Sequence, residues 1–386
     1  MTENKAYQPS DDNLSQLFSK FLGNSGGDRF QGTNGDDLLI GNGGNDALQG
    51  AEGDDLLISG DPDNAIPPVE SILPTELPMN SVANAAPLTV DAPTIVGTDG
   101  HDTLQGTDRN DVVDGGKGDD ILHGGAGDDR LLWNPGGGSD IVNGGDGTDV
   151  SVINGGNEGE FFALGQNAEG KAVLDRLSQT PFNVTAESTE QFEVNAGTGN
   201  DFLDVNQLLD TGVQSLKFSG GEGNDILSGA GTNIALNTFG DTGDDILIGG
   251  SGDDNFTGGA GNDLTIGNGG KDLFIFDTGA VFSAAEIGVD TLTDFTTGED
   301  KIVLDKNTFA SLQSEAGHGF SAASEFATVQ NDAESVTSDA LIVYSAGSGK
   351  LFYNSNGAED GFGRGAEFAT IAGASALTAE DFVVQI

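Results

Sequence analysis

The stretch GGKGDDILHGGAGDDRLL, residues 115–132, contains the same nine-residue unit twice. Each unit reads Gly-Gly-x-Gly-x-Asp-x-U-x, where U is apolar, as in Asp120 followed by Leu122 and Asp129 followed by Leu131. The pattern extends to both sides: fifteen of sixteen Asp residues in this phase have Gly two residues earlier, and fourteen have Leu, Val or Phe two residues later. Three positions kept in phase over so many units indicate a repeat architecture.

The Asp residues of the repeat form three runs and one isolated unit, AGTGNDFLD, which contains Asp201. Two gaps, from Asp129 to Asp140 and from Asp225 to Asp245, are two residues longer than a multiple of nine. We take the Asp residues of the three runs as candidate metal ligands: Asp28, Asp37, Asp46, Asp55, Asp102, Asp111, Asp120, Asp129, Asp140, Asp149, Asp225, Asp245, Asp254, Asp263 and Asp272.

The letters of the unit specify a turn followed by a short strand. Glycine at fixed places permits a positive φ and lets main-chain carbonyl groups turn inward. The x-U-x tail is a three-residue strand whose central apolar side chain points inward. Two units make one coil, so residues eighteen apart stack, and each Asp lies beside carbonyl oxygens of neighbouring turns. A cage of six to eight hard oxygens suits Ca²⁺ better than Mg²⁺ or a soft metal.

This unit resembles the nonapeptide repeat of RTX (hemolysin-type) calcium-binding proteins, and the resemblance covers residues 23–58, 97–152 and 196–275. It implies an all-β chain in which a right-handed parallel β-roll, in two or three blocks, holds Ca²⁺ in its turns and a β domain follows at the C-terminal side. Stacking then predicts on the order of eight calcium ions. The pairs are Asp28 with Asp46, Asp37 with Asp55, Asp102 with Asp120, Asp111 with Asp129, Asp120 with Asp140, Asp129 with Asp149, Asp245 with Asp263, and Asp254 with Asp272.

The alternative interpretation of the Gly/Asp repeat is a flexible acidic coil. Such a coil has no reason to keep an apolar residue in phase, so the ordered roll is favoured. Ser151 and Thr265 stand at U positions and predict locally weaker coils.

The composition excludes several classes of protein. The 386 residues include 63 acidic and 14 basic ones, a net charge of −49, with 62 Gly and no Cys. Disulfides, thiolate metal sites and a Cys nucleophile are therefore impossible. Nucleic acid and anionic membrane surfaces would be repelled by this charge. We also expect no membrane insertion, because no run approaches the ~20 apolar residues that a membrane helix needs.

Pattern and composition divide the chain into seven segments. Leu14, Leu17, Phe18, Phe21 and Leu22 have helical spacing and predict a short helix that caps the first roll or, alternatively, binds a partner. Seven of the ten Pro residues mark an extended linker, with a recognition role as the alternative. The segments are a capping helix (1–22), a first roll (23–60), the linker (61–93), a second roll (94–152), a β insert or ion-free β-stack (153–219), a third roll (220–275) and a C-terminal secretion and capping domain (276–386).

The segment 153–219 loses the calcium pattern but keeps strand signals. Phe161–Leu164 and Ala172–Leu174 predict a hairpin across Asn167–Gly170. Further strands are predicted at Phe182–Val184, Phe192–Val194 and Val213–Phe218. The segment is either a structural spacer or the place where a specific ligand binds.

The C-terminal region changes to alternating strands separated by Gly/Asn turns. It resembles the C-terminal domain of RTX exoproteins, including the segment DTLTDFTTGEDKI at Asp290–Ile302. The resemblance implies an uncleaved signal for type I (ABC) secretion in the last ~60 residues, which agrees with a start, MTENKAYQPSDDNLSQ, that has no basic and apolar signal pattern. Asp290, Asp294 and Asp300 are candidates for one further calcium site, although Asn354 stands where such proteins often have Asp.

The sequence offers no recognisable catalytic motif. It contains no HExxH, G-x-S-x-G or P-loop pattern, and its three His residues are His101, His123 and His318. We therefore expect a non-enzymatic, extracellular calcium-binding protein that folds on Ca²⁺ binding outside the cell, with a structural role or one at a cell surface or matrix. The alternatives are a non-catalytic adhesion or ligand-binding module that uses 153–219, or an exported hydrolase whose site is not recognised. The expected partners are calcium, the type I secretion machinery and a surface or matrix component.

Overall fold

The computed structural model describes residues 94–386, except 179, 323, 360 and 373–376, and the backbone of five strands nearer the N-terminus. The chain divides into two compact units, Met1–Val82 and Ala83–Ile386. Each unit is described by itself.

The described strands of the first unit pair in parallel. They are β1 (Ser19–Leu22), β2 (Arg29–Gln31), β3 (Asp37–Ile40), β4 (Ala47–Gln49) and β5 (Leu56–Ile58). β3 lies between β1 and β5, and β2 pairs with β4, always with partners eighteen residues apart, such as Ser19 with Asp37.

The predicted helix over the first 22 residues is wrong at Ser19–Leu22, which form β1, while residues 1–18 lie outside the described part. The physical reason lies in the repeat, because Phe21 is nine residues before Phe30 and therefore in the U phase. Pairing with β3 satisfies the backbone groups of these residues as well as a helix would.

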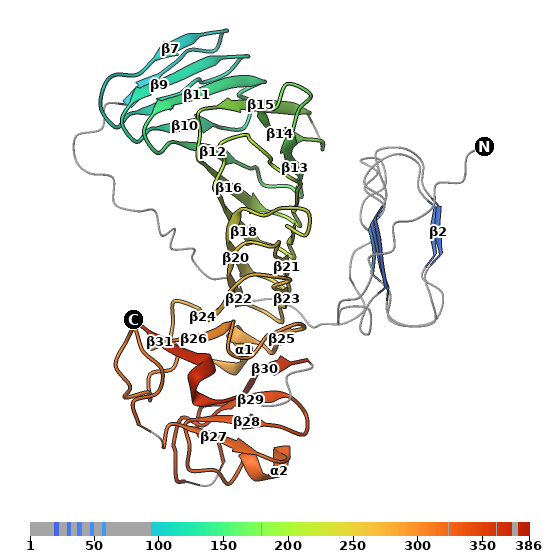
Figure 1. Cartoon of the computed structure of the whole chain (residues 1–386), viewed down its shortest axis with the longest axis vertical. Helices are drawn as coiled ribbons and strands as arrows, with labels where there is room; N and C mark the ends of the chain where they lie inside the picture. Colours follow the sequence, from blue (N-terminus) through green and yellow to red (C-terminus); the bar gives the residue numbers. More distant parts are fainter. Residues whose placement is uncertain are drawn as a thin grey trace. The chain divides into compact units, whose positions relative to one another are not determined.

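The second unit consists of two long sheets that face each other (Figure 1). Sheet one has eleven strands, and all of its neighbouring strands are parallel. In spatial order they are β6 (Thr94–Val96), β8 (Val112–Asp114), β10 (Arg130–Trp133), β12 (Val150–Asn154), β16 (Gln191–Thr198), β18 (Ser215–Glu222), β20 (Ala235–Thr242), β22 (Asn255–Ala260), β24 (Leu273–Phe276), β26 (Lys301–Asp305) and β31 (Phe382–Gln385).

Sheet two has fifteen strands, and the chain passes back and forth between the two sheets. In spatial order its strands are β7 (Thr103–Gln105), β9 (Ile121–Ala126), β11 (Asp140–Asp146), β15 (Phe182–Glu187), β14 (Ala172–Arg176), β13 (Phe161–Gln166), β17 (Phe202–Val205), β19 (Ile226–Ser228), β21 (Ile246–Ile248), β23 (Leu264–Ile266), β25 (Asp290–Leu292), β30 (Glu367–Ile371), β29 (Lys350–Tyr353), β28 (Ile342–Ser345) and β27 (Phe326–Val329).

Two places in sheet two are antiparallel. The strands β13, β14 and β15 form a meander that includes the predicted hairpin, which is confirmed. Gly170 closes its turn with φ 81° and donates its N–H to the carbonyl of Asn167. Near the other end, β28, β29 and β30 form a second meander. The segment 153–219 thus contributes strands to both sheets, and the C-terminal region extends both sheets further.

The core is a column of U residues between the sheets. Val113, Leu122, Leu131, Leu227 and Leu247 are fully buried. The U residues point inward because alternate side chains of a strand face opposite sides of the sheet. Together with the parallel pairing, this column makes the chain an all-β parallel β-roll.

Helices are short in this unit. They are α1 (Ala284–Ile287), α2 (Asp332–Ser335) and the 3₁₀ turn η2 (Ala379–Asp381). Within the described residues, none has the length and apolar character needed to traverse a lipid bilayer.

Candidate metal centre

Carboxylates line the turns that lead into sheet two, one in each coil. The main-chain N–H of each, except at Asp140 before the meander and at Asp290 at the end of the row, donates to a carboxylate oxygen of the corresponding residue in the next coil, over 2.6–3.2 Å. We call this row the first carboxylate ladder. Its members are Asp102, Asp120 and Asp140, then, beyond the meander, Glu160, Asp201, Asp225, Asp245, Asp263 and Asp290.

A second carboxylate ladder follows the turns that lead into sheet one. The same N–H to carboxylate bonds measure 2.7–3.0 Å. Its members are Asp111, Asp129, Asp149 and Glu190, then, after an interruption at β18 and β20, Asp254, Asp272 and Asp300.

One carboxylate oxygen in most coils has no protein partner. In the ladders, Oδ1 accepts the N–H of the preceding coil, whereas Oδ2 of seven residues is buried with no hydrogen-bond donor. The seven are Asp120, Asp129, Asp149, Asp201, Asp225, Asp245 and Asp263, each at most 2 % exposed. A buried charged oxygen without a partner is costly, so these atoms require a cation or a proton.

Carboxylates at the start of a run behave differently. Oδ2 of Asp102 accepts the N–H and hydroxyl of Thr98 at 2.7 and 2.8 Å, and Oδ2 of Asp254 accepts the N–H of Gly250 at 2.8 Å. The turn itself therefore satisfies these oxygens. We call the seven residues with an unpartnered Oδ2 the inner carboxylates.

The first glycine of each unit leaves open the space into which Oδ2 points. A Cβ added to Gly124 would meet Oδ2 of Asp129 and, at 2.5 Å, the carbonyl oxygen of Gly144 in the next coil. A Cβ on Gly240 would likewise meet Oδ2 of Asp245 and the carbonyl oxygen of Gly258 at 2.5 Å. Each of these turns therefore has a small cradle lined by carboxylate and main-chain oxygens.

Burial changes the protonation of the ladder carboxylates. Desolvation raises the pKa of Asp140 to about 7 and that of Asp225 to about 7. Burial, together with the nearby charge of Asp263, raises the pKa of Asp245 to about 9. The physical cause is the loss of water around an anion, which favours the neutral acid. Without a cation the ladders are thus poorly suited to hold their charge.

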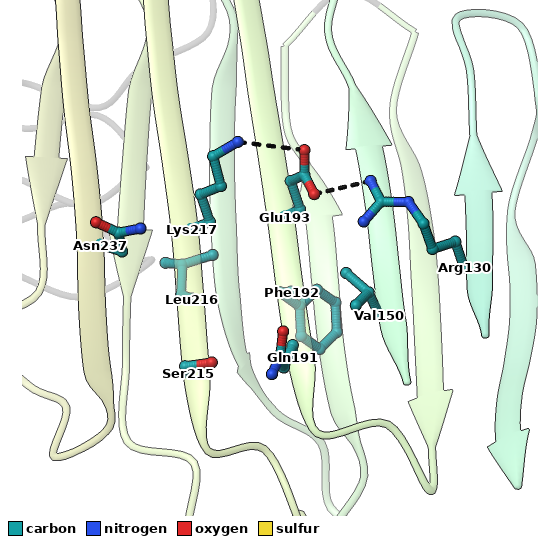
Figure 2. Close-up of a pocket in the computed structure, with 9 residues that line it drawn as sticks. All are labelled: Arg130, Val150, Gln191, Phe192, Glu193, Ser215, Leu216, Lys217 and Asn237. Atoms are coloured by element: carbon teal, nitrogen blue, oxygen red, sulfur yellow. Dashed lines mark hydrogen bonds and ion pairs between the residues drawn. The ribbon is translucent and has the colours of Figure 1, made fainter. Parts of the chain in front are cut away.

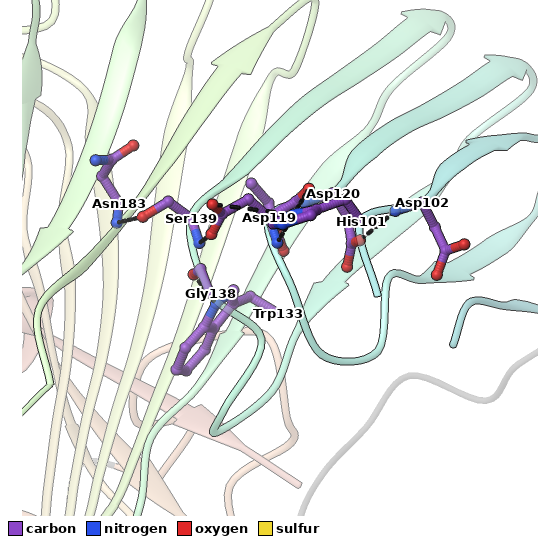
Figure 3. A network of polar contacts seen from close by, with 9 residues as sticks. His101, Asp102, Asp119, Asp120, Trp133, Gly138, Ser139 and Asn183 are labelled. Atoms are coloured by element: carbon purple, nitrogen blue, oxygen red, sulfur yellow. Dashed lines mark hydrogen bonds and ion pairs between the residues drawn. The ribbon is translucent and has the colours of Figure 1, made fainter. Parts of the chain in front are cut away.

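The residues before several ladder positions form an outer ladder, part of which is drawn in Figure 3. The N–H of Ser139 donates to Oδ1 of Asp119 at 2.9 Å, and the N–H of Asp119 donates to Nδ1 of His101 at 2.9 Å. Further down, the N–H of Asp244 donates to Oδ1 of Asn224 at 3.0 Å. These bonds explain why the unit so often reads Asp-Asp or Asn-Asp: the first side chain joins coils and the second faces the cradle.

The structure brings together the predicted stacked pairs of the described coils. Asp102 with Asp120 and Asp111 with Asp129 are joined directly across eighteen residues. Across the two-residue insertion, Asp120 with Asp140 and Asp129 with Asp149 are joined, as are Asp245 with Asp263 and Asp254 with Asp272. Asp28, Asp46 and Asp55 lie outside the described residues, and only the backbone of Asp37 is described, as the first residue of β3.

Sequence reasoning missed three members of the ladders. Asp201 is in phase but lies outside the three runs, so it is absent from the fifteen candidate ligands, and it pairs with Asp225 at 2.7 Å. Glu160 and Glu190 occupy Asp positions, followed two residues later by Phe162 and Phe192. A search that admitted Glu in the unit GGNEGEFFA, residues 155–163, would have found the first of them.

The single further site predicted from Asp290, Asp294 and Asp300 is wrong. Asp290 continues the first ladder through Asp263, and Asp300 continues the second through Asp272. Asp294 instead accepts the N–H groups of Gly267 and Asn268 at 2.9 and 2.6 Å. The side-chain amide of Asn354 donates to the carbonyls of Ser338 and Gly357.

The donor set of the cradles suits a hard cation. Over the described residues, no three Asp, Glu or His side chains converge on one point. A cation in a cradle would therefore be held by one or two carboxylates together with main-chain carbonyls. Oxygen donors of this kind match Ca²⁺, because it accepts six to eight oxygens in flexible geometry.

Comparison with known proteins agrees with this assignment. The family model of the RTX calcium-binding nonapeptide repeat, in four copies, matches residues 22–57, 96–131, 217–233 and 239–274. The chain thus contains RTX calcium-binding repeats in these four stretches. RTX repeats bind Ca²⁺, so calcium is the cation that the family places in such turns.

Two further comparisons concern the chain as a whole. No curated protein matched it. A solved structure, the extracellular lipase LipA from Serratia marcescens, aligns at 20 % identity and a TM-score of 0.22. The alignment covers 77 % of this chain and 40 % of the lipase chain.

Apart from the RTX turns, the outer face of sheet one has a hollow of about 190 Å³ (Figure 2). Glu193 lies between Arg130 and Lys217 and pairs with them at 2.8 and 3.5 Å. Although burial opposes ionisation, the hydrogen bond from Arg130 and the charges of Arg130 and Lys217 lower the pKa of Glu193. Other lining residues are Val150, Gln191, Phe192, Ser215, Leu216 and Asn237.

Proposed function

We propose that this chain is a secreted protein whose β-roll folds only when calcium binds, and that its role outside the cell is structural, at a surface or in a matrix. The observation that supports this most directly is the set of seven buried Oδ2 atoms that have no donor. The repeat family and the charge of −49 support it as well.

The ladders explain how calcium and folding are coupled. In the unfolded chain each Asp is hydrated, whereas in the roll burial raises the pKa of these carboxylates, as for Asp225 and Asp245. At neutral pH the roll without calcium is therefore destabilised by desolvated anions. Calcium, when bound, supplies the compensating charge. At a hundredfold excess over Kd, each site would stabilise the roll by about 2.7 kcal/mol.

We propose calcium sites at the seven inner carboxylates of the described coils, with carbonyl groups of the neighbouring turns as the remaining donors. Two more sites, at the stacked pairs of the N-terminal block, would keep the total on the order of eight. Asp201 is thereby added to the fifteen candidate ligands that the sequence predicts between Asp28 and Asp272.

Calcium titration of the chelated full-length chain tests the proposal. We expect the β-sheet signal in circular dichroism to appear, and the hydrodynamic radius to fall, as calcium rises to millimolar levels. Equal additions of Mg²⁺ serve as the matched control and should produce a much smaller change. A spectrum that stays the same up to ~10 mM calcium would contradict the proposal.

A second candidate function is a ligand-binding module, and the hollow around Glu193 favours it. The hollow brings together two cationic side chains, Arg130 and Lys217, on a strongly acidic chain. A polar glycan or another surface component would be a suitable ligand. Binding of immobilised glycans should fall in K217A and stay unchanged in K271A, whose lysine is exposed away from the hollow.

The proposal includes export by a type I route and no catalytic activity. The C-terminal strands and the segment Asp290–Ile302, which resemble those of RTX exoproteins, support the first part. Co-expression with a type I exporter, with and without the last ~60 residues, tests it: truncated protein that reaches the medium equally well would refute this route. Hydrolysis of esters or peptides by the calcium-loaded chain would refute the second part.

A further inference from the structure

Glu160 occupies a metal-ligand position in the first carboxylate ladder. Its unit, GGNEGEFFA at residues 155–163, keeps the glycine pair and the inward Phe162, and its N–H donates to Oδ1 of Asp201 at 2.6 Å. The main chain of this coil therefore follows the same path as its calcium-type neighbours. Only the side chain differs, since Glu is one methylene longer than Asp.

Both oxygens of Glu160 have partners within the protein. Oε2 accepts the N–H of Gly156 at 2.6 Å, and Oε1 accepts Nη1 of Arg176 at 2.6 Å. The carboxylate is fully buried and the guanidinium group is nearly so, at 8 % exposure. This contrasts with Asp201 and Asp225 in the following coils, whose Oδ2 atoms have no donor. A positive charge is already present at Glu160, supplied by the chain.

Arg176 reaches this position because the meander interrupts sheet two. It is the last residue of β14, opposite Phe162 of β13 and Phe182 of β15, and its side chain belongs to the inward set of that strand. Its guanidinium carbon lies 5.2 Å from the ring centre of Phe182 and 5.8 Å from that of Trp133. These two rings stack at 3.6 Å. The aromatic pair and the carboxylate fix the cation in place.

We propose that Arg176 is a built-in cation that takes the place of calcium at Glu160, so that this coil closes without a metal ion between two metal-dependent runs. The inference rests on the proposed function, because it presumes calcium in the other coils. A buried carboxylate needs a compensating cation, and a fixed guanidinium meets that need at every calcium concentration.

Counting bound calcium in the full-length chain tests the inference. R176A leaves Glu160 buried without its cation, and we expect it to bind one more calcium ion per chain than the wild type. The matched control is R130A, which also breaks an Arg–Glu pair, with Glu193, in the hollow on sheet one, where the carboxylate is not a ladder member; its calcium count should not change. E160Q should keep the wild-type count, whereas D201N should lose an ion.

A double variant tests the inference even if R176A does not fold. E160Q/R176A removes both charges and should fold with the wild-type calcium count. Terbium emission excited through Trp133, the single tryptophan, should rise in R176A because the vacated position lies close to that ring. A calcium count that falls in E160Q, or that does not rise in folded R176A, would overturn the inference. A wild-type chain that binds no calcium would instead refute the proposed function.

Discussion

The main-chain N–H of Asp225 donates a 2.7 Å hydrogen bond to Oδ1 of Asp245, one coil further along the roll. The other oxygen of Asp245 is buried without a donor. A single side chain thus joins two coils with one oxygen and faces the cradle with the other. Asp recurs in the unit because it can fill both roles, one with each carboxylate oxygen. A mutation that removes the charge but keeps one oxygen can separate the two roles.

D245N should separate these roles. The amide keeps an oxygen that can accept the N–H of Asp225, but it loses the charge that holds a cation. We expect one calcium ion to be lost, and stability at saturating calcium to fall by about 2–3 kcal/mol, the contribution of one site. Calorimetry and calcium counting measure both. D210N, at an exposed residue, is the control, and an equal effect there would contradict the assignment.

G124A should close one cradle, because the added Cβ would fill the space between the Asp129 carboxylate and the carbonyl oxygen of Gly144. Gly124 has no positive φ, yet a Cβ there would enter the space beside Oδ2 of Asp129. We expect weaker calcium binding and a higher calcium midpoint for folding, followed by circular dichroism. G269A is the matched control, since nothing lies within 4 Å of the added Cβ. Equal midpoints for the two variants would argue against a cation in this cradle.

Calcium affinity should fall as the pH is lowered from 8 to 6. Burial raises the pKa of Asp225 and Asp272 to about 7 in the metal-free roll, so protons compete with calcium in this range. The stability of the metal-free roll should change in the opposite direction. Because the raised pKa values let the folded form bind more protons than the unfolded form, the free energy of unfolding rises as the pH falls. Isothermal titration at both pH values checks the first statement, and urea unfolding in chelator checks the second. An affinity independent of pH would contradict the assignment of these carboxylates as ligands.

S151A should stabilise the roll. Ser151 stands at a U position, is fully buried, and its hydroxyl has no partner. Removing an unsatisfied buried hydroxyl without changing the side-chain volume much should raise the free energy of unfolding by about 1 kcal/mol. Urea unfolding at saturating calcium measures it. S219A, at a half-buried residue of β18, should stay within about 0.5 kcal/mol of the wild type.

The roll could be predicted from sequence because its local and long-range signals have the same period. A residue such as Leu122 defines an inward position, and adding one coil of eighteen residues identifies its neighbour in space. The insertion before Asp140 did not obscure this, since two extra residues loop out without shifting the phase of the later units.

Other features could not be read from the repeat. The repeat pattern did not identify Glu160 as a ladder member because the pattern was defined by Asp. Glu places an equivalent carboxylate one methylene further from the main chain. The spacing from Asp263 to Asp290 is 27 residues, with α1 in between, so the eighteen-residue coil does not predict this pair. The pairing of Arg176 with Glu160 depends on how the meander folds. The sequence does not show that the guanidinium group is buried. At β1, sheet pairing outweighed the predicted helix for Phe21 and Leu22.

Each coil of the described roll adds inward side chains to the core column, and its strands pair with those of the coils before and after it. The number of coils can therefore change without altering the structure of the coils that remain. Removing or duplicating eighteen residues within a run would shift the ends by about 4.8 Å, the distance between neighbouring strands, and leave the remaining turns unchanged. The length of the roll is thus set by the number of its turns.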